Sequence, residues 1–155
     1  DPEMVERIYE AAYAGVDVEM SVRGNCSIVT DRLPENCHIR INGIIDRYLE
    51  HSRIFVFAAG GEEKVFIGSA DWMPRNLDNR VEVVVPVYDP TIKQEMKRIV
   101  DYALRDVRQG RTVDGTGAHM PWTCEEPLET GSQQALYRYY EALEAKEREY
   151  DAGMA

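Results

Sequence analysis

Cysteine is scarce in this sequence of 155 residues. Its three cysteines, Cys26, Cys37 and Cys124, are odd in number and none belongs to a Cys-x-x-Cys pair. This pattern argues against a disulfide framework and offers no zinc-binding spacing. Free thiols are typical of a reducing compartment, so the sequence predicts a cytoplasmic protein.

Long apolar runs are also absent. No stretch approaches the roughly 18 residues of a membrane span, and no signal peptide opens the chain. With 44% apolar and 30% charged residues, the composition is that of a soluble globular domain without a transmembrane segment. The chain lacks an initiator methionine and begins at Asp1-Pro2, which reads as a helix N-cap followed by proline. We interpret it as a domain cut from a longer protein.

The net charge of −10 argues at first sight against a polyanion ligand, and we expect no nucleic acid partner. The acidity, however, lies in the two flanks. Residues 20–80 hold eight basic and eight acidic side chains, and seven of the eight basic ones are arginine. Local arrangement therefore decides whether this middle part binds phosphate.

Helix and strand patterns alternate along the chain without an internal repeat. Helical periodicity or length predicts helices over residues 2–14, 44–50, 91–108 and 132–150, and alternating or β-rich runs predict strands over 16–22, 39–41, 53–57, 64–67 and 81–87. The third and fourth of these strands are expected to form an antiparallel hairpin around Gly60-Gly61, and the fifth, the most apolar, to lie centrally. The sequence thus predicts an α/β fold with a mixed β-sheet flanked by helices. We expect one domain over 1–110, with 111–155 as a loop and a helix that pack on it.

Residues 46–80 are the most informative stretch. They bring His51 together with four arginines, Arg47, Arg53, Arg75 and Arg80, in a strand-turn-strand context. Guanidinium groups bind phosphate oxygens bidentately and remain charged, whereas imidazole changes protonation near neutral pH. The combination indicates a phosphate-handling site.

The same residues carry a family resemblance. The run RYLEHSRIFVF, then a Gly-Gly turn, then FIGSADWMPRNLDNRVEVVVPV resembles the C-terminal domain of bacterial polyphosphate kinase. Upstream, VRGNC at 22–26 resembles that family's RGxC element, and Arg23 precedes His51 by 28 residues, as the family pattern requires. The resemblance extends from about residue 5 to about residue 107. GSAD at 68–71 also resembles the GSxN element of the phospholipase D superfamily, so a phospholipase D-like fold is implied.

The resemblance implies a parent protein that reversibly transfers the terminal phosphate of ATP to inorganic polyphosphate through a phosphohistidine, with Mg²⁺. Nothing in this chain matches the family's nucleophilic histidine or its magnesium-binding elements, which belong to a preceding domain. We therefore expect no metal site here and no activity of the fragment alone. The implied partners are ATP or ADP, polyphosphate and the preceding domains, in an oligomeric full-length protein that is cytoplasmic or membrane-associated.

By resemblance, His51 is the catalytic residue of this fragment and lines the nucleotide-phosphate site, while Arg23 contacts the phosphates of ATP. Arg53 takes the place of the lysine in the superfamily's HxK pattern, where it would neutralise phosphate. From the residues alone, His51 is equally a histidine at the end of a helix, and Arg23 a member of a surface ion pair.

Several further residues stay open. Arg75 and Arg80 either bind phosphate or pair with Asp71, Asp78 or Glu82. Asp46 or Glu50 would orient the ring of His51, and Ser69 and Asp71 would either bond near it or cap a turn. Trp72 is expected to pack rather than to stack on a base.

Two other functions also remain open. A phospholipase D-like phosphodiesterase half-domain would need an HxKxxxxD motif. This chain has Arg53 at the lysine position and no aspartate where the motif requires one. A decayed, non-catalytic interaction module is the other alternative, because the loop SIVTDRLPENC at 27–37 departs from the family's usual PGxxG-like element.

Overall fold

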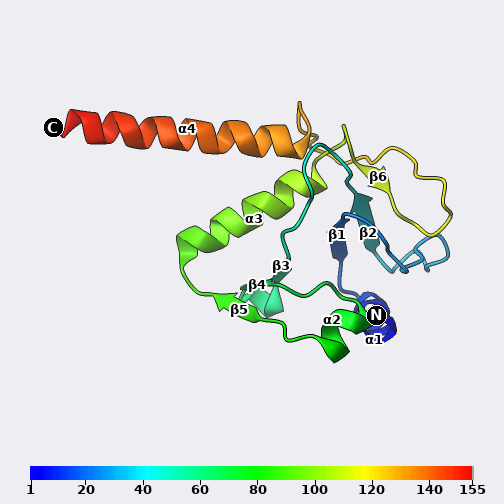
Figure 1. Ribbon diagram of the computed structural model, residues 1–155. Coiled ribbons are helices and arrows are strands. Elements are labelled where there is room, and N and C mark those ends of the chain that lie inside the picture. Colours follow the sequence, from blue (N-terminus) through cyan, green and yellow to red (C-terminus); the bar gives the residue numbers. More distant parts are fainter. Residues whose placement is uncertain (155) are drawn as a thin grey trace.

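The computed structural model describes residues 1–154 (Figure 1). Helices and strands alternate in the order α1 (Pro2–Tyr13), β1 (Val18–Val22), β2 (Ile39–Gly43), β3 (Ile54–Phe57), the 3-10 turn η1 (Ala59–Gly61), β4 (Lys64–Gly68), α2 (Pro74–Asn79), β5 (Val84–Val87), α3 (Pro90–Leu104), β6 (Arg111–Thr112) and α4 (Ser132–Gly153). The predicted α/β class is confirmed. The strands divide into two three-stranded sheets, ordered β1-β2-β6 and β3-β4-β5.

Helices α1 and α3 begin as the sequence predicts. The carboxylate of Asp1 accepts a hydrogen bond from Met4 N, and that of Asp89 accepts from Thr91 N and Ile92 N. In each case a proline follows the cap, where its missing N–H costs no hydrogen bond. Both helix starts are therefore set locally.

The first sheet carries the apolar core. Strands β1 and β2 are parallel, with Val18 opposite Ile39 and Val22 opposite Gly43, and β6 pairs antiparallel with the end of β2. Helix α1 packs its apolar side against this sheet. The buried cluster consists of Ala12, Ile28, Cys37, Ile39 and Ile41. The carboxyl end of β1 is thereby fixed, and Arg23 follows it directly.

The second sheet is antiparallel and includes the predicted hairpin, in which Ile54 faces Ile67 and Phe57 faces Lys64. The prediction that strand 81–87 lies centrally is wrong, because β5 is an edge strand and Val81 is fully exposed. Pro86 within β5 has no N–H to donate, which suits an edge position. An apolar run that looks buried in the sequence therefore lies at the surface of this chain.

The predicted helix over 44–50 is also wrong. Ile44 is buried and its N–H bonds to Val22 O, which extends the sheet pairing, whereas Ile45, Tyr48 and Leu49 are largely exposed. With its apolar side chains uncovered, so short a segment gains too little to form a helix. It forms an irregular connection that bends at residues 47–48 and leads into β3, so His51 does not lie at the end of a helix.

Helix α4 packs on α3 only near its beginning and then extends away from the rest of the chain (Figure 1). At the contact, the guanidinium of Arg98 lies 4.2 Å from the ring centroid of Tyr139, whose hydroxyl donates to Glu95. Burial and this carboxylate raise the pKa of the neighbouring Tyr140 to about 12. Within residues 1–154, none of the helices combines the length and the apolar character needed to cross a membrane.

Candidate anion-binding site

Arg23 and Asp71 meet although 48 residues separate them. Arg23 follows β1 of the first sheet, and Asp71 follows β4 of the second. Arg23 Nη2 lies 3.4 Å from Asp71 Oδ2, and both side chains are about 30% exposed. The long distance leaves this ion pair loose, and Arg23 makes no other ion pair within 4.0 Å in residues 1–154.

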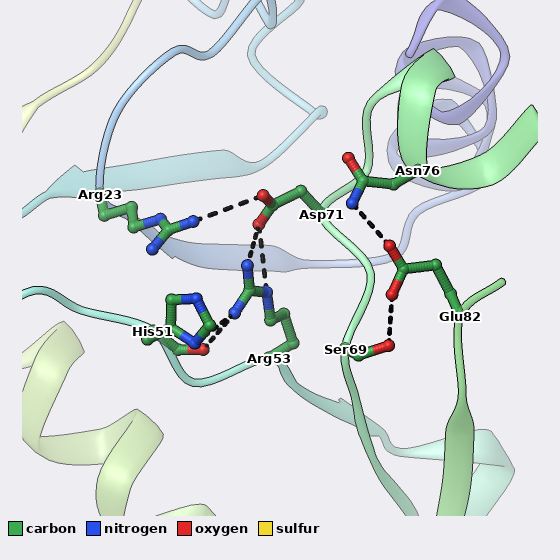
Figure 2. A network of polar contacts seen from close by, with 7 residues as sticks. All are labelled: Arg23, His51, Arg53, Ser69, Asp71, Asn76 and Glu82. Carbon is green, nitrogen blue, oxygen red and sulfur yellow. Dashed lines mark hydrogen bonds and ion pairs between the residues drawn. The ribbon is translucent and has the colours of Figure 1, made fainter. Parts of the chain in front are cut away.

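Arg53 makes the tighter contacts with the same carboxylate (Figure 2). Its Nε and Nη2 donate to Asp71 Oδ1 at 3.1 and 2.8 Å, and its side chain is only 13% exposed. The remaining nitrogen, Nη1, lies 2.6 Å from the carbonyl oxygen of His51 and 2.8 Å from its Nδ1. All three nitrogens of Arg53 are thus engaged within the protein.

The imidazole of His51 is exposed, and Arg53 fixes its orientation. A guanidinium only donates hydrogen bonds, so Nδ1 must accept and carries no proton in this arrangement. The ring proton therefore belongs to Nε2, an assignment made from the hydrogen-bond partners. Neither Asp46 nor Glu50 contacts the ring among the described hydrogen bonds. Glu50 instead accepts from Gln133 Nε2 at 2.6 Å, so the prediction that one of these carboxylates orients His51 is wrong.

A second polar network lies beside the first (Figure 2). The hydroxyl of Ser69 donates to Glu82 Oε2, Asn76 Nδ2 donates to Glu82 Oε1 at 2.8 Å, and Val83 N donates to Ser69 Oγ. The Ser69 hydroxyl and then the Asn76 amide lower the pKa of the Glu82 carboxyl group. Ser69 therefore ties β4 to the segment before β5 and does not contact His51 in the described structure.

Three other residues of this stretch take minor positions. Trp72 stacks on Phe55, with ring centroids 5.0 Å apart and planes 3° from parallel, which confirms that it packs. Arg75 and Arg80 are exposed, and neither forms an ion pair within 4.0 Å in the described part of the chain. Pairing with Asp71, one of the alternatives left open for these arginines, is not found there, because Arg23 and Arg53 contact that carboxylate.

Sequence reasoning placed Arg23 and His51 in one site but missed how Asp71 connects them. The GSAD element marked Asp71 as a neighbour of His51, yet its shared use by two arginines depends on how the two sheets meet. The cluster of Arg23, Arg53 and Asp71 carries one net positive charge, and His51 adds an N–H donor. Such a set is suited to binding an anion with several oxygens, such as a phosphate.

The fold and this cluster define an α/β domain in which arginine and histidine side chains gather around Asp71. Residues 1–133 match the family described as polyphosphate kinase C-terminal domain 2, so the chain belongs to that family. The resemblance drawn from the sequence is thus confirmed.

Named relatives agree with this assignment. The chain is 38% identical over 147 residues to a polyphosphate kinase of Escherichia coli (strain K12), covering 95% of this chain and 21% of the relative. It is 42% identical over 139 residues to a polyphosphate kinase of Synechocystis, covering 88% of this chain and 19% of the relative. The crystal structure of polyphosphate kinase from Porphyromonas gingivalis superposes with a TM-score of 0.85 at 40% identity, covering 94% of this chain and 22% of that one. The chain therefore spans about a fifth of the length of these relatives.

Proposed function

We propose that this chain is the C-terminal part of a polyphosphate kinase, which reversibly transfers the terminal phosphate of ATP to inorganic polyphosphate. One observation carries the proposal: Arg23, which follows β1 of the first sheet, and His51, which precedes β3 of the second, join one contact network through Asp71 and Arg53. Family membership supports the same reading, since the relatives are named polyphosphate kinase.

Arg23 would bind the phosphates of ATP. Its only described ion pair is the 3.4 Å contact with Asp71, so several of its N–H groups are available to phosphate oxygens. Gly24 follows it, and an added Cβ there would meet nothing within 4 Å. The backbone around Arg23 is therefore open to a ligand.

His51 would act on the phosphoryl group in transfer. With Nδ1 held by Arg53, Nε2–H is the group that can donate, either to an oxygen on which negative charge develops or to the leaving oxygen. Arg53 adds positive charge nearby, which favours an anionic ligand. In this role the chain would supply one wall of an active site.

The remaining chemistry would come from outside this chain. Within residues 1–154, no group of three or more His, Cys, Asp or Glu side chains is arranged to hold a metal ion. Asp71, the carboxylate of the cluster, is already engaged by two arginines. These residues do not fit a magnesium site, so we assign the Mg²⁺ ligands and the phosphorylated histidine to preceding domains of a cytoplasmic, oligomeric enzyme.

The proposal is tested by comparing the complete protein with this chain alone. With labelled ATP, Mg²⁺ and polyphosphate, the complete protein should lengthen the polyphosphate and form an acid-labile phosphoprotein. The 155-residue chain, checked for folding by circular dichroism, should do neither. A complete protein that leaves polyphosphate unchanged would contradict the function, and acid-labile label on His51 would contradict the division of roles.

A further inference from the structure

We propose that Asp71 is the positioning residue of this site: it anchors Arg53, which in turn holds His51 in the orientation and tautomer that present Nε2–H to the ligand. This inference rests on the proposed function and adds a role for a residue that contacts no substrate. It follows from the order of the contacts, Asp71 to Arg53 to His51.

The geometry separates the two arginines. Asp71 Oδ1 receives two hydrogen bonds from Arg53, while Oδ2 receives one long contact from Arg23. Arg53 is the more buried of the two arginines. A guanidinium fixed through Nε and Nη2 has little freedom to rotate, so Nη1 is held in place against His51. Arg53 is therefore part of the support, and Arg23 remains the ligand-facing arginine.

The positive charges of Arg23 and Arg53 also require the carboxylate of Asp71 between them. Without Asp71, two guanidinium groups would share this small region with no described carboxylate in contact, and each would be drawn toward solvent or toward a bound anion. Arg53 would then be free to leave Nδ1 of His51, and the ring could rotate and exchange tautomers. Removing the negative charge should therefore weaken positioning while leaving the attraction for phosphate intact or increased.

The test uses steady-state kinetics on the complete enzyme with the substitution Asp71→Asn. We expect kcat to fall about 10- to 100-fold, as is typical when a supporting contact of a reactive group is lost, while KM for ATP stays equal or decreases. Asp78→Asn on the neighbouring helix α2 is the matched control, because it removes the same charge from an exposed side chain that makes no described ion pair. It should retain the wild-type kcat and KM.

A second variant distinguishes positioning from general loss of structure. Arg53→Lys keeps the positive charge but has one nitrogen in place of three. It cannot reproduce the two bonds to Asp71 together with the contacts to His51, so kcat should fall as in Asp71→Asn. Asp71 and Arg53 act through one contact, so their effects should not add. The kcat of the double variant should therefore lie within about threefold of the kcat of the slower single variant. Asp71→Glu, which retains the charge, should recover part of kcat.

The outcomes are separable. If the wild-type complete protein has no kinase activity, the proposed function fails. If the wild type is active and Asp71→Asn keeps its kcat, raises only KM, or loses kcat in step with a large fall in thermal midpoint, the positioning role is wrong. Should Asp71→Asn not fold, Arg53→Lys decides alone, and its normal kcat would overturn the inference.

Discussion

One nitrogen of Arg53 contacts two atoms of His51: Nη1 lies 2.8 Å from Nδ1 of the ring and 2.6 Å from the backbone carbonyl oxygen of His51. The two residues are two positions apart in the segment that leads into β3. Nε2 of the ring makes no hydrogen bond within residues 1–154, so under the proposed function it is the atom that would meet the ligand.

Substitutions at His51 should distinguish the roles of its two ring nitrogens. In the complete enzyme, His51→Ala should lower turnover by roughly 10²- to 10⁴-fold if the ring serves the transferring phosphoryl group. His51→Asn keeps an acceptor near Arg53 but no donor at Nε2, so it should be as slow as His51→Ala. His51→Gln extends an amide toward the Nε2 position. It should keep appreciable activity if the ring only donates a hydrogen bond, and little if it transfers a proton.

Thermal midpoints on the same preparations provide the control for these variants. The imidazole of His51 is exposed, so its removal should change folding stability little. A large drop in melting temperature that parallels the loss of turnover would show that His51 is a packing residue. The function of the site would then depend on Arg23.

Arg23 is expected to govern the ATP requirement. A charge-assisted contact to phosphate typically contributes about 1.5–3 kcal/mol, so Arg23→Ala should raise the apparent ATP requirement by roughly tenfold or more. Arg23→Lys should recover only part, because lysine lacks the planar fork. The control is Arg32→Ala, because Arg32 is exposed and its one described ion pair is a 3.8 Å contact with Asp31. Unchanged kinetics in a folded Arg23→Ala enzyme would assign Arg23 to an ordinary surface ion pair.

The features that could be predicted from the sequence are those set by nearby residues. The caps at Asp1 and Asp89 and the hairpin around Gly60-Gly61 depend on short-range chemistry, and the structure confirms them. The motif spacing likewise placed Arg23 and His51 in one site. Each of these signals can be read within a few residues or from a fixed interval.

The errors arise where distant packing decides. Residues 44–50 have a helical apolar pattern, yet only Ile44 finds a buried position in this chain. The run 81–87 looks like a central strand because it is apolar, but neighbouring strands cover only one of its edges. The role of Asp71 was missed for a related reason, since its partners come from two different sheets.

Asp106 should be among the residues most important for stability. Its side chain is fully buried, with Oδ1 accepting from the backbone N–H groups of Arg108 and Gln109 and Oδ2 accepting from Ser132 N at 2.6 Å. Asp106 thus joins the end of α3 to the start of α4. Each buried donor left without a partner costs about 1–3 kcal/mol, so Asp106→Ala should lower the free energy of unfolding by roughly 3 kcal/mol or more.

Urea unfolding of the chain measures this effect. Asp101→Asn is the control, because Asp101 forms an exposed ion pair with Arg105 and such pairs contribute only about 0–1 kcal/mol. The stability of Asp106→Asn should lie between those of Asp106→Ala and Asp101→Asn. Its amide oxygen can still accept from the N–H groups that one of the two carboxylate oxygens serves. Equal stability of Asp106→Ala and Asp101→Asn would mean that the connection between α3 and α4 does not depend on this carboxylate.

Glu82 should make folding stability depend on pH. Hydrogen bonds from Ser69 and Asn76 lower the pKa of its carboxyl group in the folded chain relative to the unfolded chain. The carboxylate therefore stabilises the fold at pH values above the unfolded pKa, and this contribution is lost as pH falls through the lower, folded pKa.

Glu82→Gln keeps one acceptor oxygen but no charge, so its thermal midpoint should lie below that of the wild type at pH 7. The difference between the two midpoints should close in the acid range. The exposed Glu62, whose side chain makes no described hydrogen bond or ion pair, provides the control Glu62→Gln. Melting curves of the three proteins from pH 7 to pH 3 check this, and a gap between wild type and Glu82→Gln that stays constant with pH would show that the loss comes from shape rather than from charge.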